Sequence, residues 1–235
     1  TVQTGGGNVA QTGQLVVTGD TSIDAATGSI TLLNALNIFG IAPAIVPGTP
    51  VPPTPTLALH GTNTSVATSG NLQLSSVSNT GPMTLRAPNG SIDLGTAFIT
   101  GGDLTLQSRD DMNLGGANIT GSLNMSSTTG TVSFGQATVT GNLTATTNGQ
   151  QVDLGSANVG GNLAVTTQGG DVVQTTNAGS ALRVTGTSTI NAGTGDVSLP
   201  NIPNQFGGAV SLQANDVVLK GSNGLILGSS TVTGN

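Results

Sequence analysis

The chain of 235 residues contains no cysteine, tryptophan, tyrosine or glutamate, and only four phenylalanines. Without cysteine no disulfide can cross-link the fold, so packing and hydrogen bonds must stabilise it. Large aromatic side chains fill much of an ordinary globular core. Their scarcity predicts a narrow core built from valine, leucine, isoleucine and alanine.

Charge is scarce as well, and the balance is acidic. The net charge is −6, and the four basic residues Arg86, Arg109, Arg183 and Lys220 are scattered along the chain. Nucleic acid and anionic membrane surfaces are therefore not expected partners. No run approaches the roughly 18 to 20 apolar residues that cross a bilayer, and the first residues lack a basic and apolar signal pattern. We expect no membrane insertion.

Glycine is abundant, with 37 residues, which raises the alternative of a disordered linker. Disordered chains are usually poor in hydrophobic residues and rich in charge. Here hydrophobic residues make up 35% and charged residues 6%, and the apolar residues are regularly spaced. The composition therefore favours an ordered chain.

An internal repeat of about twenty residues runs from residue 81 to residue 180. Successive blocks begin at Gly81, Gly101, Gly121 and Gly141, and a fifth block from Gly161 drifts. Within each block the apolar residues alternate in three short runs separated by small polar residues, which is strand spacing. One block predicts one rung of a coil with three strands and three turns.

Equivalent positions of the blocks should stack into columns along such a coil. The sequence predicts inward columns Ile92–Met112–Val132–Val152, Leu94–Leu114–Phe134–Leu154, Ala97–Ala117–Ala137–Ala157 and Ile99–Ile119–Val139–Val159, and a glycine column Gly95–Gly115–Gly135–Gly155. An unbroken glycine column indicates a bend that needs positive φ or has no room for a Cβ. About ten to twelve rungs, stacked at about 4.7 to 4.9 Å, would form a rod on the order of 50 Å long.

A longer repeat lies over the short one. The segment that ends at Gly40 matches the segment that ends at Gly207, with Ile23 aligned to Ile190, Leu32 to Leu199 and Phe39 to Phe206. Residues 7–12 also resemble residues 170–175. We therefore expect one β-helix segment over residues 1–235, with a proline-rich insertion at 41–55. Because residues 227–235 match 134–142, the segment stops in mid-rung, and we expect a longer array.

The module VTGTSTINAGTGDVSL from Val184, followed by AVSLQANDVVL from Ala209 and LGSSTVTGN from Leu227, resembles the repeats of filamentous-haemagglutinin-type exoproteins. These are large bacterial adhesins exported by two-partner secretion, some of them biofilm-matrix adhesins. The resemblance implies an all-β fold, a right-handed parallel β-helix. It also implies secretion and a place at the bacterial cell surface, associated with the outer membrane.

The proline-rich run is the one candidate partner-binding loop. Its six prolines, Pro43, Pro47, Pro50, Pro52, Pro53 and Pro55, cannot supply the donors of a central strand, so the run must leave the coil. It is either a polyproline II arm for a partner or an inert decoration of one turn.

Some parallel β-helices are polysaccharide lyases or hydrolases, so the acidic residues are candidates for a catalytic pair. Asp93 and Asp153 share an outward column three rungs apart, roughly 14 Å, with Asp111 on an adjacent column. Paired carboxylates for hydrolysis lie about 5 to 9.5 Å apart. A solvated polar face is the favoured interpretation.

Three further features of the sequence have both a functional and an ordinary structural interpretation. Asp110 and Asp111 follow Arg109 and are too few for a calcium ion, which takes about six to eight oxygens. His60, the only histidine, should face solvent and has no evident nucleophile or metal partner. A threonine column, Thr100–Thr120–Thr140, suggests ice binding, but ordinary packing between rungs explains it as well.

The sequence therefore predicts a structural or adhesive rod and not an enzyme. We expect no catalytic residue, metal or cofactor. The expected partners are an exopolysaccharide or host glycan and the remainder of the parent chain. The alternative is a carbohydrate-binding or carbohydrate-active, lyase-like β-helix module.

Overall fold

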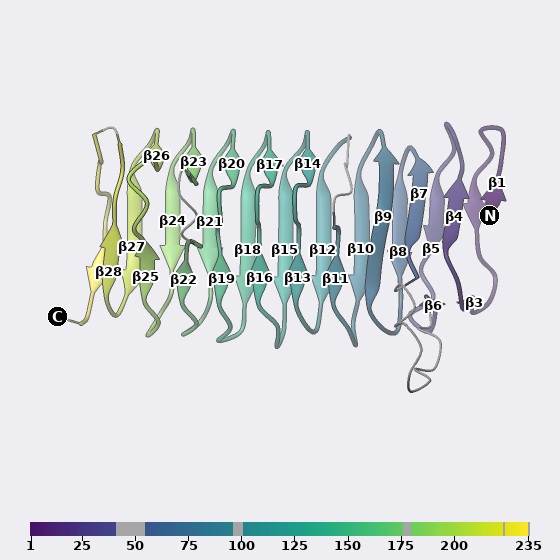
Figure 1. Cartoon of the computed structure of the whole chain (residues 1–235), viewed down its shortest axis with the longest axis horizontal. Coiled ribbons are helices and arrows are strands. Elements are labelled where there is room, and N and C mark those ends of the chain that lie inside the picture. The colour runs from purple at the N-terminus through teal and green to yellow at the C-terminus, as the bar shows by residue number, and fades with distance from the viewer. Residues whose placement is uncertain (41–54, 96–100, 176–179, 223, 235) are drawn as a thin grey trace, which may run out of the picture.

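The computed structural model describes residues 1–40, 55–95, 101–175, 180–222 and 224–234. All paired strands among these residues run parallel, and each pairs with its equivalents one turn earlier and later along the chain. Figure 1 shows these strands side by side along the long axis, with the two termini at opposite ends. The chain is a β-solenoid of about ten turns with roughly 20 residues per turn, as the repeat predicts.

Three faces surround the core. The first face contains β1 (Val2–Gln3), β4 (Thr21–Asp24), β7 (Leu57–Gly61), the second half of β9 (Leu72–Asn79) and, after residues 96–100, the strands β14 (Asn118–Ile119), β17 (Thr138–Val139), β20 (Asn158–Val159), β23 (Arg183–Val184) and β26 (Gln205–Phe206). Hydrogen bonds between glycines at the ends of these strands, such as Gly161 N to Gly141 O at 2.9 Å, continue along the corner that follows this face.

The second face is one sheet of eleven strands. They are β2 (Val9–Ala10), β5 (Ile30–Leu32), β8 (Thr64–Ala67), β10 (Met83–Ala87), β12 (Leu104–Ser108), β15 (Leu123–Ser127), β18 (Leu143–Thr147), β21 (Leu163–Thr166), β24 (Ser188–Asn191), β27 (Val210–Ala214) and β29 (Thr231–Val232). Its longest strands have five residues and alternate between the core and solvent, which is the period that the sequence predicts.

The third face contains β3 (Val16–Val17), β6 (Ile38–Phe39), the first half of β9, β11 (Ile92–Asp93), β13 (Met112–Asn113), β16 (Val132–Ser133), β19 (Val152–Asp153), β22 (Val172–Val173), β25 (Val197–Leu199) and β28 (Val217–Leu219). Strand β9 bends around the corner between two faces: Leu72 and Gln73 pair with β11, while Ser76 to Asn79 pair with β7. For this reason the first and third faces share one continuous sheet.

The predicted columns are confirmed wherever the structure describes them. Ile92, Met112, Val132 and Val152 are register partners, and the described leucine, alanine and valine columns are buried in one core that runs through the rod. Ala97 and Ile99 lie outside the described residues. Full burial of a Leu, Ile or Val side chain stabilises by about 1.5 to 3 kcal/mol, so each rung contributes several such increments, and Phe134 is the one aromatic side chain in these columns.

The glycine column marks a sharp corner. Gly95, Gly115, Gly135 and Gly155 all have positive φ, between 50° and 56°. A Cβ built on Gly115 would lie 2.0 Å from the carbonyl oxygen of Gly95, so both predicted reasons for glycine, its conformation and the lack of space, apply here.

Asparagine and aspartate side chains complete the hydrogen bonding at the strand entrances. Oδ1 of Asp103 accepts the backbone N–H of Ser122 at 2.8 Å, and Oδ1 of Asn142 accepts that of Asn162 at 2.8 Å. In each pair the donor is the equivalent residue of the next rung. The side-chain oxygen takes the place of the backbone carbonyl that a continuous strand would provide. It thus accepts the backbone N–H that has no carbonyl partner at the bend.

The two copies of the longer repeat form the same local structure on different faces. The first copy runs from β2 to β6 and the second from β22 to β26, with β4 equivalent to β24 and β6 to β26. Strand β4 lies on the first face and β24 on the second. Every strand of the second copy is likewise one face further around the rod, because the three faces are alike enough for the module to begin on any of them.

Candidate functional site

The proline-rich insertion lies in the sequence between β6 and β7. Pro43, Pro47, Pro50, Pro52 and Pro53 lie outside the described residues, and Pro55 is the one predicted partner-binding residue that the structure places. A Cβ built on Gly40 would lie 2.7 Å from the Pro55 carbonyl oxygen, so the two ends of the insertion meet closely. Asp20 accepts the Thr56 N–H at 2.8 Å, which fixes the point where the chain returns to β7.

A groove lies beside this return point. Its lining includes Phe39, Pro55, Asn71, Gln73 and Asp93. Apolar and polar side chains therefore face the same hollow beside the point where the chain returns to β7.

The acidic residues on the third face have local structural partners. Asp93 and Asp153 share an outward column, as predicted, and each accepts the backbone N–H of the glycine two residues later, at 2.8 and 2.9 Å. Asp111 accepts the N–H of Thr131 at 2.8 Å. These carboxylates shape the corners of successive rungs, which is sufficient to explain their positions.

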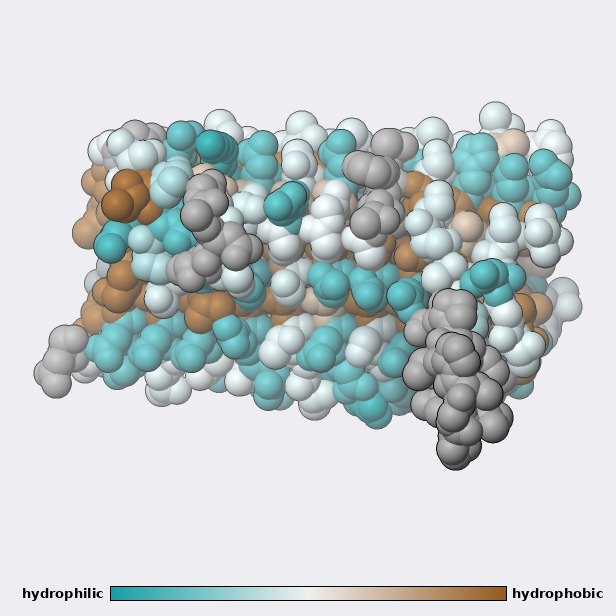
Figure 2. Space-filling view, in the orientation of Figure 1, coloured by the Kyte–Doolittle hydropathy of each residue, from teal (hydrophilic) through white to brown (hydrophobic). Residues whose placement is uncertain are grey.

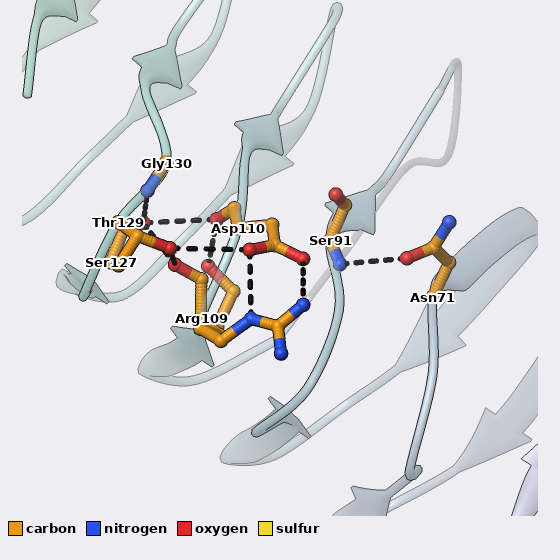
Figure 3. Close-up of polar contacts among 8 residues, drawn as sticks. Asn71, Ser91, Arg109, Asp110, Ser127, Thr129 and Gly130 are labelled. Atoms are coloured by element: carbon orange, nitrogen blue, oxygen red, sulfur yellow. Dashed lines mark hydrogen bonds and ion pairs between the residues drawn. The ribbon is translucent and has the colours of Figure 1, made fainter.

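Asp110 belongs to a polar network at one corner of the rod (Figure 3). Nε and Nη2 of Arg109 donate to its two carboxylate oxygens at 2.9 and 2.8 Å, and the hydroxyl of Thr129 donates to Oδ1 at 3.2 Å. The side-chain hydrogen bond from Arg109 lowers the pKa of the Asp110 carboxyl, and the same contact raises the pKa of Arg109. The Asp110 carboxylate, which with Asp111 is too few for a calcium site, is thus engaged by a guanidinium.

Ser127 joins this network to the backbone. Its hydroxyl donates to the Asp110 carbonyl at 2.9 Å and accepts the N–H of Gly130 at 3.0 Å, so it connects two consecutive rungs. Within the described ranges no group of three or more His, Cys, Asp or Glu residues could hold a metal ion.

A second polar network occurs once in each copy of the longer repeat. The side-chain amides of Gln174 and Asn204 exchange two hydrogen bonds, both of 2.8 Å, and both residues are buried. Gln11 and Asn37 form the same pair at 2.7 and 2.9 Å. We call each pair an amide clasp. Sequence reasoning missed it, although both residue types recur at equivalent places in the two copies.

His60 faces solvent, as predicted, with its side chain 49% exposed. The sequence did not reveal its partner: Nδ1 lies 2.8 Å from Oδ1 of Asp24, on the neighbouring strand β4. A hydrogen bond from the backbone N–H of Ala26 lowers the pKa of the Asp24 carboxyl, and the neighbouring His60 lowers it further. The insertion separates these two residues in the chain, which conceals their register.

The threonine column is described only in part, because Thr100 lies outside the described residues. Thr120 and Thr140 are exposed, and both hydroxyls donate to backbone carbonyls of the preceding rung, those of Gly101 and Ile119. Their hydroxyls are thus used within the rod.

Most of the visible outer surface is polar. In Figure 2 hydrophilic side chains follow the rod in rows, and exposed apolar side chains gather near the C-terminal end. That end exposes Val218, Ile226, Leu227 and Val232. The structure contains no helix, within the residues it describes, that is long and apolar enough to cross a membrane.

Comparison with known protein families assigns the repeat to a family. A family described as repeats of unknown function (DUF5649) matches residues 1–44, 101–154 and 140–213, together about two thirds of the chain. The chain belongs to this family. The DUF5649 matches include both amide clasps, Gln11–Asn37 in the first range and Gln174–Asn204 in the last. No curated protein and no solved structure matches the chain.

Proposed function

We propose that this DUF5649 chain is a structural and adhesive rod segment of a secreted bacterial surface adhesin of the filamentous-haemagglutinin type. The observation that carries the proposal is the continuous stack of about ten parallel rungs around a single core. Consecutive rungs are hydrogen-bonded along their length, so a load is shared between many bonds. Such a rod holds a binding end away from a cell, or cross-links a matrix, without needing a pocket of its own.

Its chemistry suits the bacterial exterior. The chain lacks cysteine, so its fold does not depend on the redox state of the compartment. In the described rungs, short strands and corners bond to adjacent rungs, which protects their backbone from a protease. The sequence resemblance supports two-partner secretion and a cell-surface or biofilm-matrix location.

Surface location is tested with an antibody raised against this segment. On intact cells of the parent bacterium we expect labelling equal to that of permeabilised cells, and an antibody against a cytoplasmic protein serves as the control. Fab fragments should also reduce attachment of the cells or cohesion of their biofilm. Labelling that needs permeabilisation would contradict the proposal.

A carbohydrate-binding module, with or without lyase activity, is the second candidate. A groove at the glycine corner is lined by hydroxyl, amide and carboxylate groups, including Ser133, Gln136, Asp153, Ser156 and Thr175. Such groups hydrogen-bond sugars, although no aromatic platform accompanies them there. The groove is the specific observation that favours this alternative.

The two candidates are separated on an array of bacterial exopolysaccharides and host glycans. The whole chain is compared with a variant that lacks residues 41–54 and with Gln136→Ala. Saturable binding lost in Gln136→Ala would favour the groove, and binding lost with the deletion would make the insertion the recognition element. If neither change alters binding, the rod itself has no glycan site at these places. Turnover of the bound polymer that is lost in Asp111→Ala would indicate a lyase.

A further inference from the structure

Four polar side chains stand in register on four consecutive strands of the first face. Gln3 on β1 pairs with Asp24 on β4, Asp24 with His60 on β7, and His60 with Ser78 on β9. All four residues are at least partly exposed and lie on the outer side of the sheet. The column therefore places an acid, an imidazole and a hydroxyl in a row, in the order that a serine nucleophile and its general base require.

The carboxylate of Asp24 is oriented from two sides. Its Oδ1 accepts the backbone N–H of Ala26 at 2.8 Å, and Gln3 is its register partner on β1. The same Oδ1 lies 2.8 Å from Nδ1 of His60. This contact favours the tautomer that carries its proton on Nδ1, so Nε2 is free to accept a proton.

Ser78 is on the opposite side of His60 from Asp24. Adjacent strands are about 4.7 to 4.9 Å apart, so rotation of the serine side chain brings its hydroxyl within reach of an imidazole one strand away. In unliganded sites such contacts are often long and shorten when a substrate binds.

Small residues beside this column leave room for a substrate. Ser22, Ala58 and Ser76 are register partners two residues earlier on the same three strands. They share a shallow groove with Asp24, His60 and Ser78. The small size of these residues suits a short acyl group better than a bulky one.

We propose that Ser78 is the nucleophile of an acyl-transfer site that accepts short-chain esters. Its hydroxyl oxygen bonds to the acyl carbon while its proton passes to Nε2 of His60. The bond from the acyl carbon to the leaving alkoxide breaks, and the alkoxide takes that proton. Water, activated by the same nitrogen, then releases the carboxylic acid and restores Ser78. Asp24 and Gln3 are positioning residues.

The site is expected to be slow. Where β7 and β9 pair, their backbone N–H groups belong to the ladder between rungs, so those donors are not free to form an oxyanion hole. Loss of one such donor typically costs about 10²- to 10³-fold in rate, whereas a positioned general base contributes about 10²- to 10⁴-fold. The hydroxyl of Ser76 is the donor nearest in sequence on the same side of the strand.

Covalent labelling tests the proposal independently of turnover. A fluorophosphonate forms an oxygen–phosphorus bond with an activated serine and releases fluoride, and peptide mass spectrometry locates the adduct. We expect adduct on Ser78, with a labelling rate at least about tenfold lower in His60→Gln and a smaller loss in Asp24→Asn. Ser126→Ala, which changes an exposed serine on the second face, should label like the unchanged protein.

The pH profile separates a chemical role of His60 from a structural one. The one other titratable side chain on β1, β4, β7 and β9 is Asp24, and the hydrogen bond from the Ala26 N–H and the contact with His60 lower the pKa of its carboxyl. Labelling should therefore fall in acid, where the protonated imidazole cannot accept a proton, and this dependence should vanish in His60→Gln. Hydrolysis of 4-nitrophenyl acetate should fall at least about tenfold in Ser78→Ala.

Three outcomes would overturn the site: no adduct on Ser78, equal labelling of His60→Gln, or full esterase activity in Ser78→Ala, which would make the imidazole itself the nucleophile. Unchanged circular dichroism and melting of each variant exclude unfolding as the cause of a loss. The proposed role as a rod does not depend on this result, because it requires no reaction.

Discussion

Replacing Gly115 with alanine should destabilise the solenoid by at least about 3 kcal/mol, whereas the same change at Gly116 should alter its stability by less than about 1 kcal/mol. The two glycines are neighbours at the same corner. A Cβ on Gly115 would lie 2.0 Å from the Gly95 carbonyl oxygen, while a Cβ on Gly116 would meet nothing within 4 Å. Backbone on both sides of this contact is held by the ladder, so the clash cannot be relieved by a side-chain rotation.

The clash matters more than the conformation at this corner. Ala26 and Gln168 have φ values of 50° and 55°, so the fold accepts a side chain at positive φ where space is available. The left-handed conformation alone costs an alanine about 1 to 2 kcal/mol, and the remaining destabilisation comes from displaced backbone. This effect is measured as the urea midpoint of unfolding. Hydrogen exchange should accelerate mainly in the rungs next to Gly115, and equal midpoints for the two variants would contradict the explanation.

Replacing Asn204 with leucine should destabilise the protein by about 3 to 5 kcal/mol. Its Oδ1 accepts the backbone N–H of Leu182 at 2.9 Å as well as Nε2 of Gln174 at 2.8 Å. Its Nδ2 donates back to Gln174 at 2.8 Å. Without Asn204, a buried backbone donor and a buried amide lose partners, and each unsatisfied group costs about 1 to 3 kcal/mol.

The amide clasp is tested by a double-mutant cycle. Gln174→Leu with Asn204→Leu should cost at least about 1 kcal/mol less than the sum of the two single changes, because the double variant leaves neither amide without its partner. Asn124→Ala serves as the control for an exposed asparagine on β15 and should change stability by less than about 0.5 kcal/mol. Additive effects would show that the two amides act separately.

Asn37→Leu, the equivalent change in the first copy of the longer repeat, should destabilise the protein less than Asn204→Leu. Asn37 is as buried as Asn204, but its partner Gln11 is half-buried, whereas Gln174 is buried. Water can therefore replace part of the lost hydrogen bonding in Asn37→Leu. The two copies share sequence and contacts, so this difference isolates the contribution of burial.

The regular rungs could be predicted from the sequence in nearly every respect. Residues that recur every twenty positions must stack if the chain coils with that period, so the columns at Ile92, Leu94 and Gly95 followed from counting. The glycine column also predicted a crowded corner with positive φ. Where the period is regular, residues twenty positions apart in the sequence are neighbours in the structure, so the sequence spacing is sufficient to predict the contact.

The candidate sites depended on contacts that no spacing revealed. Asp24 and His60 are separated by the insertion, and β9 turns a corner before it presents Ser78, so their register follows from neither the rung length nor the longer repeat. The amide clasps join residues at a corner where the sequence is least regular. Most of the prolines in the predicted partner-binding loop lie outside the described residues, and its role stays a prediction.

The sequence alone determined the period, the composition of the core and the residues at the corners, because burial and backbone conformation restrict residue type at every rung. It did not determine which face each repeat occupies. The two copies of the module begin on different faces, because the three faces of parallel strands accept the same strand-and-corner pattern. Only the accumulated length of all intervening rungs, irregular at β9 and at the insertion, decides which side chains share a surface.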